Sequence, residues 1–215
     1  MGSVRLTKIV SAIPRCDTLA DVGCDHGYIG IEALSTGRAD NVVFVDVSEP
    51  SLNKARQNCP SEYTKRVKYL CQDGLGNLVV DCAVIAGMGG LEIISILDEA
   101  KARPKKLVLQ PMRNQKDVRE YLQDKYEIVT DVKFYDGKYY DLIYAELSDN
   151  PTKLSELELE YGKTNVANPS SDFVSYLRNE WKKITNYPIY PNEPKLQAKA
   201  DEIYNMIAEY SAKKS

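Results

Sequence analysis

Short apolar runs alternate with helical patterns along the first 125 residues, and this alternation limits the possible folds more than any other feature. Strands are predicted at residues 18–22, 42–47, 67–71, 82–86 and 106–109, and helices at residues 6–13, 28–36, 50–59, 91–100 and 116–125. The strand runs lack polar alternation, as expected when both faces of a sheet are covered. The pattern predicts an α/β fold with a mostly parallel sheet between two layers of helices.

The pattern changes twice toward the C-terminus. Strand-like runs at residues 127–135 and 139–147 flank Asp136-Gly137-Lys138, and Asp-Gly is a strong signal for an antiparallel hairpin. After Asn150-Pro151 only helical spacing remains, with one apolar stripe from Phe173 to Ile184 and a second, of coiled-coil spacing, from Leu196 to Tyr210. We therefore expect an α/β domain over residues 1–150 and a helical, coiled-coil-like extension over residues 151–215, whose two long helices pair antiparallel.

Composition excludes several classes of protein. No apolar run reaches the roughly 20 residues that span a bilayer, and the start of the chain has no signal-peptide pattern, so we expect no membrane partner. Five cysteines without Cys-x-x-Cys spacing and a single histidine predict reduced thiols, a cytoplasmic location and no metal site. A net charge of −3 argues weakly against a protein that mainly grips nucleic acid. Basic clusters at residues 101–106 and 113–119 are either solvated or a local patch.

A glycine turn follows the first predicted strand, in Asp21-Val22-Gly23-Cys24-Asp25-His26-Gly27-Tyr28. A glycine turn between a strand and a helix lets the backbone approach a nucleotide closely. Methyltransferases typically have acid-x-Gly-x-Gly-x-Gly here, and this chain keeps that frame except for Asp25, which replaces the middle glycine. A purely structural turn is the alternative. The missing Gly-x-Gly-x-x-Gly disfavours a nicotinamide oxidoreductase, as does the terminal hairpin.

Polar or glycine-rich segments also follow the next four predicted strands. Asp46 ends the second strand, where an acid can accept both ribose hydroxyls of an adenosyl group, or instead cap the next helix. Gln72-Asp73-Gly74 follows the third strand and suits an adenine edge, or is a simple turn. Ala86-Gly87-Met88-Gly89-Gly90 and Gln110-Pro111 follow the fourth and fifth strands and could line the substrate side of the same cleft.

Taken together, these segments resemble the bacterial tRNA (adenine-N1)-methyltransferases that act on adenine 22 of tRNA, the TrmK family. The matching segments are the helix ending at Pro14, Asp21-Val22-Gly23-Cys24-Asp25-His26, Gln72-Asp73-Gly74-Leu75, Ile85-Ala86-Gly87-Met88-Gly89-Gly90, Leu109-Gln110-Pro111 and the helical extension. Met112 departs from an Asn frequent in the family, and Asp46 replaces the Glu of some members. The resemblance implies a class I methyltransferase, Rossmann-like fold with seven strands.

The resemblance also implies S-adenosyl-L-methionine (SAM) as cofactor, S-adenosyl-L-homocysteine (SAH) as its product, and tRNA as partner. The implied cofactor residues are Asp21, Gly23, Cys24, Gly27, Asp46, Asp73, Gly74 and Gly87. The implied substrate residues are Tyr28, Met88, Gly89, Gly90, Gln110 and Pro111. Asp25 and His26 are the implied catalytic residues. We expect a monomer, although nothing in the sequence fixes the oligomeric state.

Methylation of adenine N1 gives Asp25 a chemical role. The product ring is cationic unless the N6 amino group loses a proton, and a nearby carboxylate could stabilise that charge and take the proton. Alternatives remain for each residue: Asp25 could cap the following helix, His26 could brace the loop, and Tyr28 could pack in the core. A small-molecule methyltransferase and a non-catalytic adaptor are the competing functions. The C-terminal helices could touch tRNA by shape and charge, or only stabilise the fold.

Overall fold

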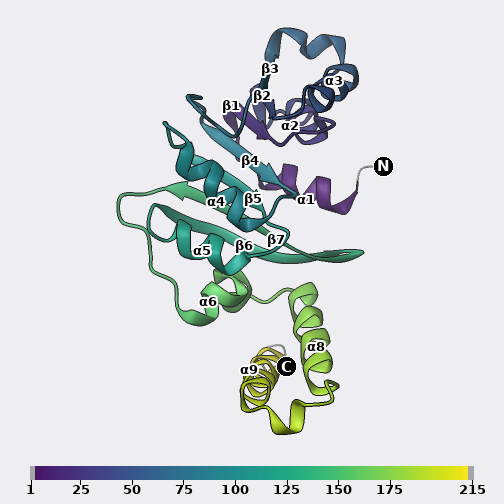
Figure 1. Ribbon diagram of the computed structural model, residues 1–215, viewed down its shortest axis with the longest axis vertical. Helices are drawn as coiled ribbons and strands as arrows, with labels where there is room; N and C mark the ends of the chain where they lie inside the picture. Colours follow the sequence, from purple (N-terminus) through teal and green to yellow (C-terminus); the bar gives the residue numbers. More distant parts are fainter. Residues whose placement is uncertain (1–2, 213–215) are drawn as a thin grey trace.

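The computed structural model describes residues 3–212, so residues 1–2 and 213–215, the outer ends of the two predicted domains, lie outside the described residues. Its centre is one seven-stranded sheet in the order β3-β2-β1-β4-β5-β7-β6 (Figure 1). The strands are β1 (Cys16–Val22), β2 (Ala39–Asp46), β3 (Val67–Cys71), β4 (Cys82–Ala86), β5 (Lys106–Gln110), β6 (Tyr126–Asp136) and β7 (Lys138–Leu147). β1 to β5 pair in parallel, whereas β7 is antiparallel to β5 and β6. The predicted sheet and its closing hairpin are confirmed.

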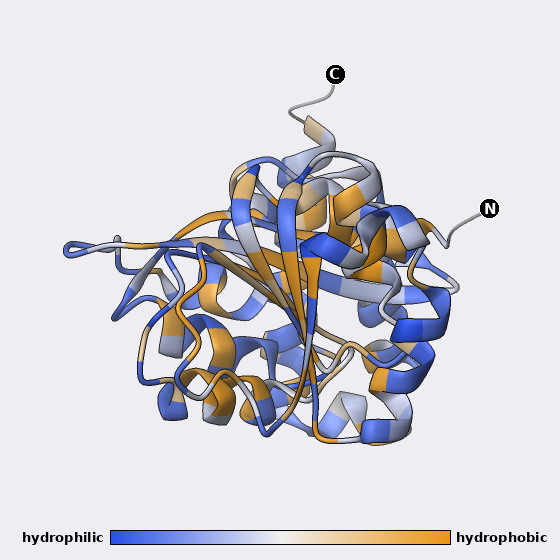
Figure 2. Ribbon diagram, turned by 90° about the horizontal axis from the view of Figure 1, so that it is seen from above, coloured by the Kyte–Doolittle hydropathy of each residue, from blue (hydrophilic) through white to orange (hydrophobic). Residues whose placement is uncertain are grey.

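Two sets of helices cover the two faces of the sheet. The helices α1 (Val4–Ala12), α2 (Tyr28–Ser35) and α3 (Glu49–Asn58) pack into one apolar cluster, and α4 (Gly90–Glu99) and α5 (Gln115–Leu122) pack into the other. A 3-10 helix, η1 (Ser61–Arg66), leads into β3. Figure 2 shows the apolar residues concentrated along the strands and on the helix faces turned toward them. Both faces are covered, as the missing polar alternation predicted.

β1 and β2 are longer than their apolar runs. They begin at Cys16 and Ala39, which are partners in the parallel register of the two strands. The added segment of β1 contains the exposed Asp17, and that of β2 contains the exposed Asp40. From the apolar pattern alone, both segments are predicted to be loops. Strand pairing, a tertiary feature, extends the strands beyond the sequence signal.

The helical extension is confirmed and contains α6 (Glu156–Tyr161), α7 (Lys163–Ala167), α8 (Ser171–Thr185), the 3-10 helix η2 (Tyr190–Asn192) and α9 (Pro194–Ala212). The two predicted apolar stripes meet in a third cluster between α8 and α9. Its ring contacts pair Phe173 with Tyr210 and Trp181 with Tyr204, so later residues of α8 meet earlier residues of α9. This order of contacts is that of an antiparallel pair, as predicted.

A buried ionic network joins the hairpin to the extension. The fully buried guanidinium of Arg119, on α5, donates to both carboxylate oxygens of Asp131, at 2.6 and 3.1 Å, and to Asp141 at 2.7 Å. Its Nη1 also donates to the backbone carbonyl of Leu159, on α6, at 3.1 Å. The Lys133 ammonium forms a second ion pair with Asp141. Each buried charge thus has a partner of opposite sign, which is the condition under which buried ions are tolerated.

α7 covers the exposed edge of β6. The backbone N–H of Asp131 donates to the Thr164 hydroxyl at 2.9 Å, and the backbone N–H of Lys133 donates to the Asn165 side-chain carbonyl at 3.0 Å. Edge strands otherwise present unpaired backbone groups. α8 also contacts the hairpin, since its Asp172 accepts from the backbone N–H of Tyr135 at 3.0 Å. The domain boundary predicted at Asn150-Pro151 stays a prediction.

Replacing Arg119 with methionine should destabilise the protein strongly. Arg119→Met removes the cation and leaves two carboxylates buried next to each other, which costs about 3–5 kcal/mol in comparable networks. The free energy of unfolding can be measured in urea. Lys116→Met, on the exposed face of the same helix, is the control and should change it far less. Equal effects of the two substitutions would contradict a stabilising role for the network.

Candidate active site

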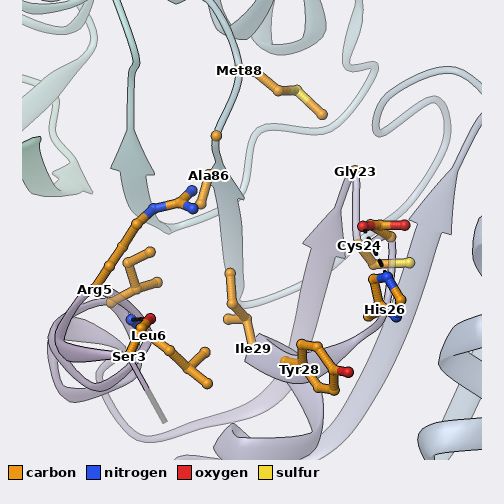
Figure 3. A pocket seen from close by; sticks show the side chains of 13 residues that line it. Ser3, Arg5, Leu6, Gly23, Cys24, His26, Tyr28, Ile29, Ala86 and Met88 are labelled. Carbon is orange, nitrogen blue, oxygen red and sulfur yellow. Dashed lines mark hydrogen bonds and ion pairs between the residues drawn. The ribbon is translucent and has the colours of Figure 1, made fainter. Parts of the chain in front are cut away.

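Two neighbouring cavities open where the carboxyl ends of the parallel strands meet. The larger, of about 700 Å³, is lined by Ser3, Arg5, Leu6, Ile9, Gly23, Cys24, Asp25, His26, Tyr28, Ile29, Ala86, Gly87 and Met88 (Figure 3). The smaller, of about 200 Å³, is lined by Val22, Gly23, Val45, Asp46, Val47, Gln72, Asp73, Gly74, Met88, Glu92 and Ile96. Gly23 and Met88 belong to both linings, so the cavities form adjacent halves of one cleft.

The smaller cavity holds the predicted acids of the second and third strand ends. Asp46 is oriented by two backbone N–H donors, from Ser48 to Oδ1 at 2.9 Å and from Asp25 to Oδ2 at 3.1 Å. An ionised carboxylate offers about four acceptor positions, so two remain for a ligand's hydroxyl groups. Asp73 and Gly74 line the same cavity. This donor and acceptor set fits the ribose and base of an adenosyl group.

Gly23 is where the backbone comes closest to the cleft. Its φ of +68° lies in the left-handed region, which favours glycine. A Cβ at this position would lie only 1.9 Å from the Met88 methyl carbon. The backbone conformation therefore favours glycine, whereas the Met88 methyl group, at the end of a flexible side chain, can move aside. Close approach of a nucleotide to this turn stays a prediction.

Two predicted cofactor residues lie beneath the cleft and line neither cavity. The buried Asp21 carboxylate accepts a hydrogen bond from the Gly30 N–H at 2.9 Å and ties β1 to α2. Burial raises the pKa of Asp21 to about 7. Gly27 is the N-cap residue of α2, and a Cβ there would lie 2.9 Å from the Ala55 Cβ, on α3. Their direct contact with a cofactor stays a prediction, and their positions favour support of the loop.

Asp25, His26 and Tyr28 line the larger cavity as one group. Asp25 is a non-glycine residue with φ of +43°, and such strained backbone is concentrated at functional sites. Its Oδ1 accepts from the Lys54 ammonium at 3.0 Å, and its Oδ2 lies 3.6 Å from His26 Nε2. The His26 and Tyr28 rings are stacked 5.3 Å apart, and Tyr28 is exposed rather than packed in the core. Nothing in the sequence around Lys54, on α3, predicts its contact with Asp25.

Cys24 and Gly87 are both predicted cofactor residues. They line the larger cavity and not the smaller one, which holds Asp46 and Asp73. Cys24 is buried, and burial raises the pKa of its thiol. Burial thus favours the protonated thiol, which is a poor nucleophile. Gly87 has φ of +85° and lies at the end of β4.

Of the predicted substrate residues, Tyr28 and Met88 line the larger cavity. The other four line neither cavity: Gly89, Gly90, Gln110 and Pro111. Gln110 is fully buried, and its side-chain carbonyl accepts from Arg5 Nε at 2.7 Å. Sequence reasoning missed Arg5, which belongs to a helix far away in the chain. Contact of these four residues with a substrate stays a prediction.

No group of three or more His, Cys, Asp or Glu side chains in residues 3–212 is arranged to hold a metal ion. None of the helices in this range combines the length and apolar character needed to cross a membrane.

Known proteins match this arrangement. The family pattern of a methyltransferase domain covers residues 2–143. The tRNA (adenine(22)-N(1))-methyltransferase of Bacillus subtilis is 30% identical over an alignment of 169 residues that covers 74% of this chain and 71% of that protein. The structure of Mycoplasma capricolum TrmK with SAH aligns with a TM-score of 0.80 at 27% identity, over 98% of this chain and 97% of that one.

A third similar protein also aligns over nearly its whole length. A Streptococcus pneumoniae protein assigned as a tRNA (m1A22) methyltransferase aligns with a TM-score of 0.84 at 27% identity, over 96% of this chain and 100% of that one. Its complex with SAM aligns equally well. The sheet order, the glycine turn and the acids at the strand ends define a class I methyltransferase domain. Within that class, the chain belongs to the tRNA (adenine(22)-N(1))-methyltransferase family, TrmK, as its sequence predicted.

The buried Asp21 predicts a particular pH dependence of stability. Its pKa is raised from the ordinary 3.8 to about 7, so the folded chain holds this proton more tightly than the unfolded chain. The free energy of unfolding should therefore fall as the pH rises through this range, by at most about 4 kcal/mol from this group. Urea unfolding of Asp21→Asn from pH 4 to 8 should show a smaller fall than the wild type. Asp17→Asn, exposed on the same strand, should retain the wild-type slope; an unchanged slope in Asp21→Asn would refute the assignment.

Proposed function

We propose that this chain is a SAM-dependent methyltransferase that methylates N1 of adenine 22 in tRNA. The observation that carries the proposal is the two-part cleft at the strand ends, in a chain that matches the TrmK structures over nearly its whole length, including the C-terminal helices. The smaller cavity has the acids that suit an adenosyl group. The larger cavity has the space and the stacked rings that suit a nucleobase.

The cofactor supplies an electrophilic methyl group on a sulfonium sulfur, and the protein supplies position and electrostatics. Asp46 holds the ribose hydroxyls through its two remaining acceptor positions. The backbone around Gly23 allows the cofactor to lie against the loop. Asp73 and Gly74 lie at the adenine edge. Gly23 and Met88, which line both cavities, mark the point where the methyl donor faces the base.

Asp25 acts as the catalytic carboxylate in this proposal. The lone pair on adenine N1 forms the new N–C bond as the S–C bond breaks, and the ring gains a positive charge. The Asp25 carboxylate lines the cavity that would hold this ring, stabilises its charge and accepts the proton that leaves N6. Lys54 fixes Oδ1, so Oδ2 is the oxygen left for the substrate. His26 orients Asp25 from the other side, and Tyr28 stacks beneath His26.

The remaining parts of the proposal concern the partner and the setting. α8 and α9 contact the tRNA body by shape and charge, since all cofactor residues lie before them in the chain. Adenine N1 takes part in Watson–Crick pairs, so the target base must be unpaired or locally opened to enter the cavity. We further propose that the protein acts as a monomer. We propose that it works in the cytoplasm, where tRNA is modified.

The test of function is mass spectrometry of unmodified tRNA after incubation with the protein and SAM. One methyl group on N1 of adenine 22 is expected. A tRNA with guanine at this position serves as the control and should remain unmodified. Methylation of another nucleotide, or of neither tRNA, would refute the proposal.

Removing the Asp46 carboxylate should weaken cofactor binding. Asp46→Ala deletes a partner of the ribose hydroxyls, a loss of about 1–3 kcal/mol, and calorimetry with SAH should show affinity reduced roughly tenfold or more. Asp40→Ala, exposed at the other end of β2, should leave the affinity unchanged. Equal SAH affinity in the wild type and in Asp46→Ala would remove Asp46 from the cofactor site.

Asp25→Asn should separate catalysis from binding. Asparagine keeps the size and one acceptor oxygen but neither takes the proton nor balances the cationic ring. We expect kcat to fall at least about a hundredfold and SAH affinity to change much less. Single-turnover methylation of tRNA gives the rate, and calorimetry gives the affinity. If the variant retains the wild-type rate, Asp25 is a loop residue and catalysis rests on positioning alone.

A further inference from the structure

The Arg5 side chain lines the larger cavity and is held there by uncharged partners. It belongs to α1, on the opposite side of the cavity from the glycine loop (Figure 3). Its Nε donates to the Gln110 carbonyl at 2.7 Å, and its guanidinium carbon lies 5.4 Å from the centre of the Tyr140 ring. Its Nη2 packs over Gly87, where an added Cβ would lie 2.9 Å away. Three elements therefore fix this side chain: β5, β7 and the turn after β4.

The partners that fix Arg5 are all uncharged. Gln110 is a buried amide whose own NH₂ donates to the Pro111 carbonyl at 3.2 Å, so its oxygen is left to face Arg5. The nearby Asp136 carboxylate accepts from the backbone N–H of Arg5 and not from its guanidinium. Within residues 3–212, no carboxylate forms an ion pair with Arg5, and neither Nη1 nor Nη2 donates a hydrogen bond. Four N–H groups therefore remain available at the cavity wall.

This arrangement differs from that of a structural arginine. Arg119 in the same protein is fully buried, and two carboxylates and two backbone carbonyls occupy its donors. Arg5 is half-buried, oriented by one neutral acceptor and one ring, and keeps its full positive charge toward the cavity. A guanidinium with two free parallel donors matches the geometry of a phosphate, which accepts two such bonds at once.

We infer that Arg5 binds a phosphodiester next to the target adenosine, on its 5′ or 3′ side, and thereby positions the base in the larger cavity. The inference rests on the proposed function, since it takes tRNA as the substrate. Arg5 and Asp25 lie on different walls of this cavity, one on α1 and the other in the glycine loop. A nucleotide held by its phosphate at Arg5 can place its base toward Asp25 without any reading of the sequence around it.

The competing explanation is that Arg5 only fastens α1 to the sheet through Gln110 and Tyr140. The two explanations differ in one measurable respect, which is the response to a neutral phosphate. Unmodified tRNA can be assembled with a single methylphosphonate, which carries no charge, on the 5′ or on the 3′ side of adenine 22. Methylation of these tRNAs by the wild type and by Arg5→Gln then gives kcat and KM for each pair.

We expect one of the two methylphosphonates to reduce kcat/KM of the wild type by about ten- to hundredfold, mainly through KM, since hydrogen bonds to charged groups have this value. Arg5→Gln should show a similar loss with native tRNA and almost no further loss with that methylphosphonate. Arg5→Lys, which retains the charge without the paired donors, should lie between them. SAH affinity should remain within about twofold of the wild type in both variants, because Arg5 lines only the larger cavity.

Arg103→Gln, exposed between α4 and β5, removes the same charge elsewhere and should show the full methylphosphonate effect. Two results would overturn the inference while leaving the proposed function intact. In the first, the methylphosphonate reduces kcat/KM of Arg5→Gln by the same factor as it reduces that of the wild type. In the second, neither methylphosphonate changes kcat/KM of the wild type. Failure of the wild type to methylate native tRNA would overturn the proposed function, and the inference with it. If Arg5→Gln does not fold, Arg5→Lys decides by the same comparison.

Discussion

The order of the parallel strands determines where this protein can bind a ligand. β1 lies between β2 and β4, so the chain leaves β1 toward one edge of the sheet and β4 toward the other. The helices that follow accordingly cover opposite faces, α2 and α3 on one and α4 on the other. A crevice opens where the two directions diverge, at the carboxyl ends of the strands. Both cavities lie at this crevice, and every residue proposed for catalysis or cofactor binding depends on it.

The crevice makes backbone geometry as important as side-chain chemistry. Gly23 and Asp25 both have left-handed backbone, and the turn they form directs the Asp25 N–H to Asp46 on the neighbouring strand. A hydrogen bond therefore links the loop residue proposed for catalysis directly to the acid proposed for the ribose. Because the donor is the backbone N–H of Asp25 and not its side chain, this link is compatible with substitution of the Asp25 carboxylate.

Contacts distant in sequence complete the site and hold the extension. Arg5 reaches Gln110 across 105 positions, and α1 becomes a wall of the larger cavity. Arg119 reaches the carbonyl of Leu159 across 40 positions and attaches α6 to the hairpin. In both cases one arginine serves as the connection, because its several donors can bridge groups on separate elements. The two differ in charge balance, which leads us to assign a binding role to Arg5 and a structural role to Arg119.

The sequence by itself determined the alternation of strands and helices, the closing hairpin, the glycine turn and the family, because each is encoded in neighbouring residues through apolar spacing, turn chemistry or a contiguous motif. It also singled out Asp46 and Asp25, which line the two cavities. Only the tertiary structure decided that Asp21 and Gly27 lie beneath the cleft, that Gln110 is buried, and that Lys54 and Arg5 reach the cavity. These facts depend on how separate elements pack, and no local pattern records which side chain will meet a residue from another helix.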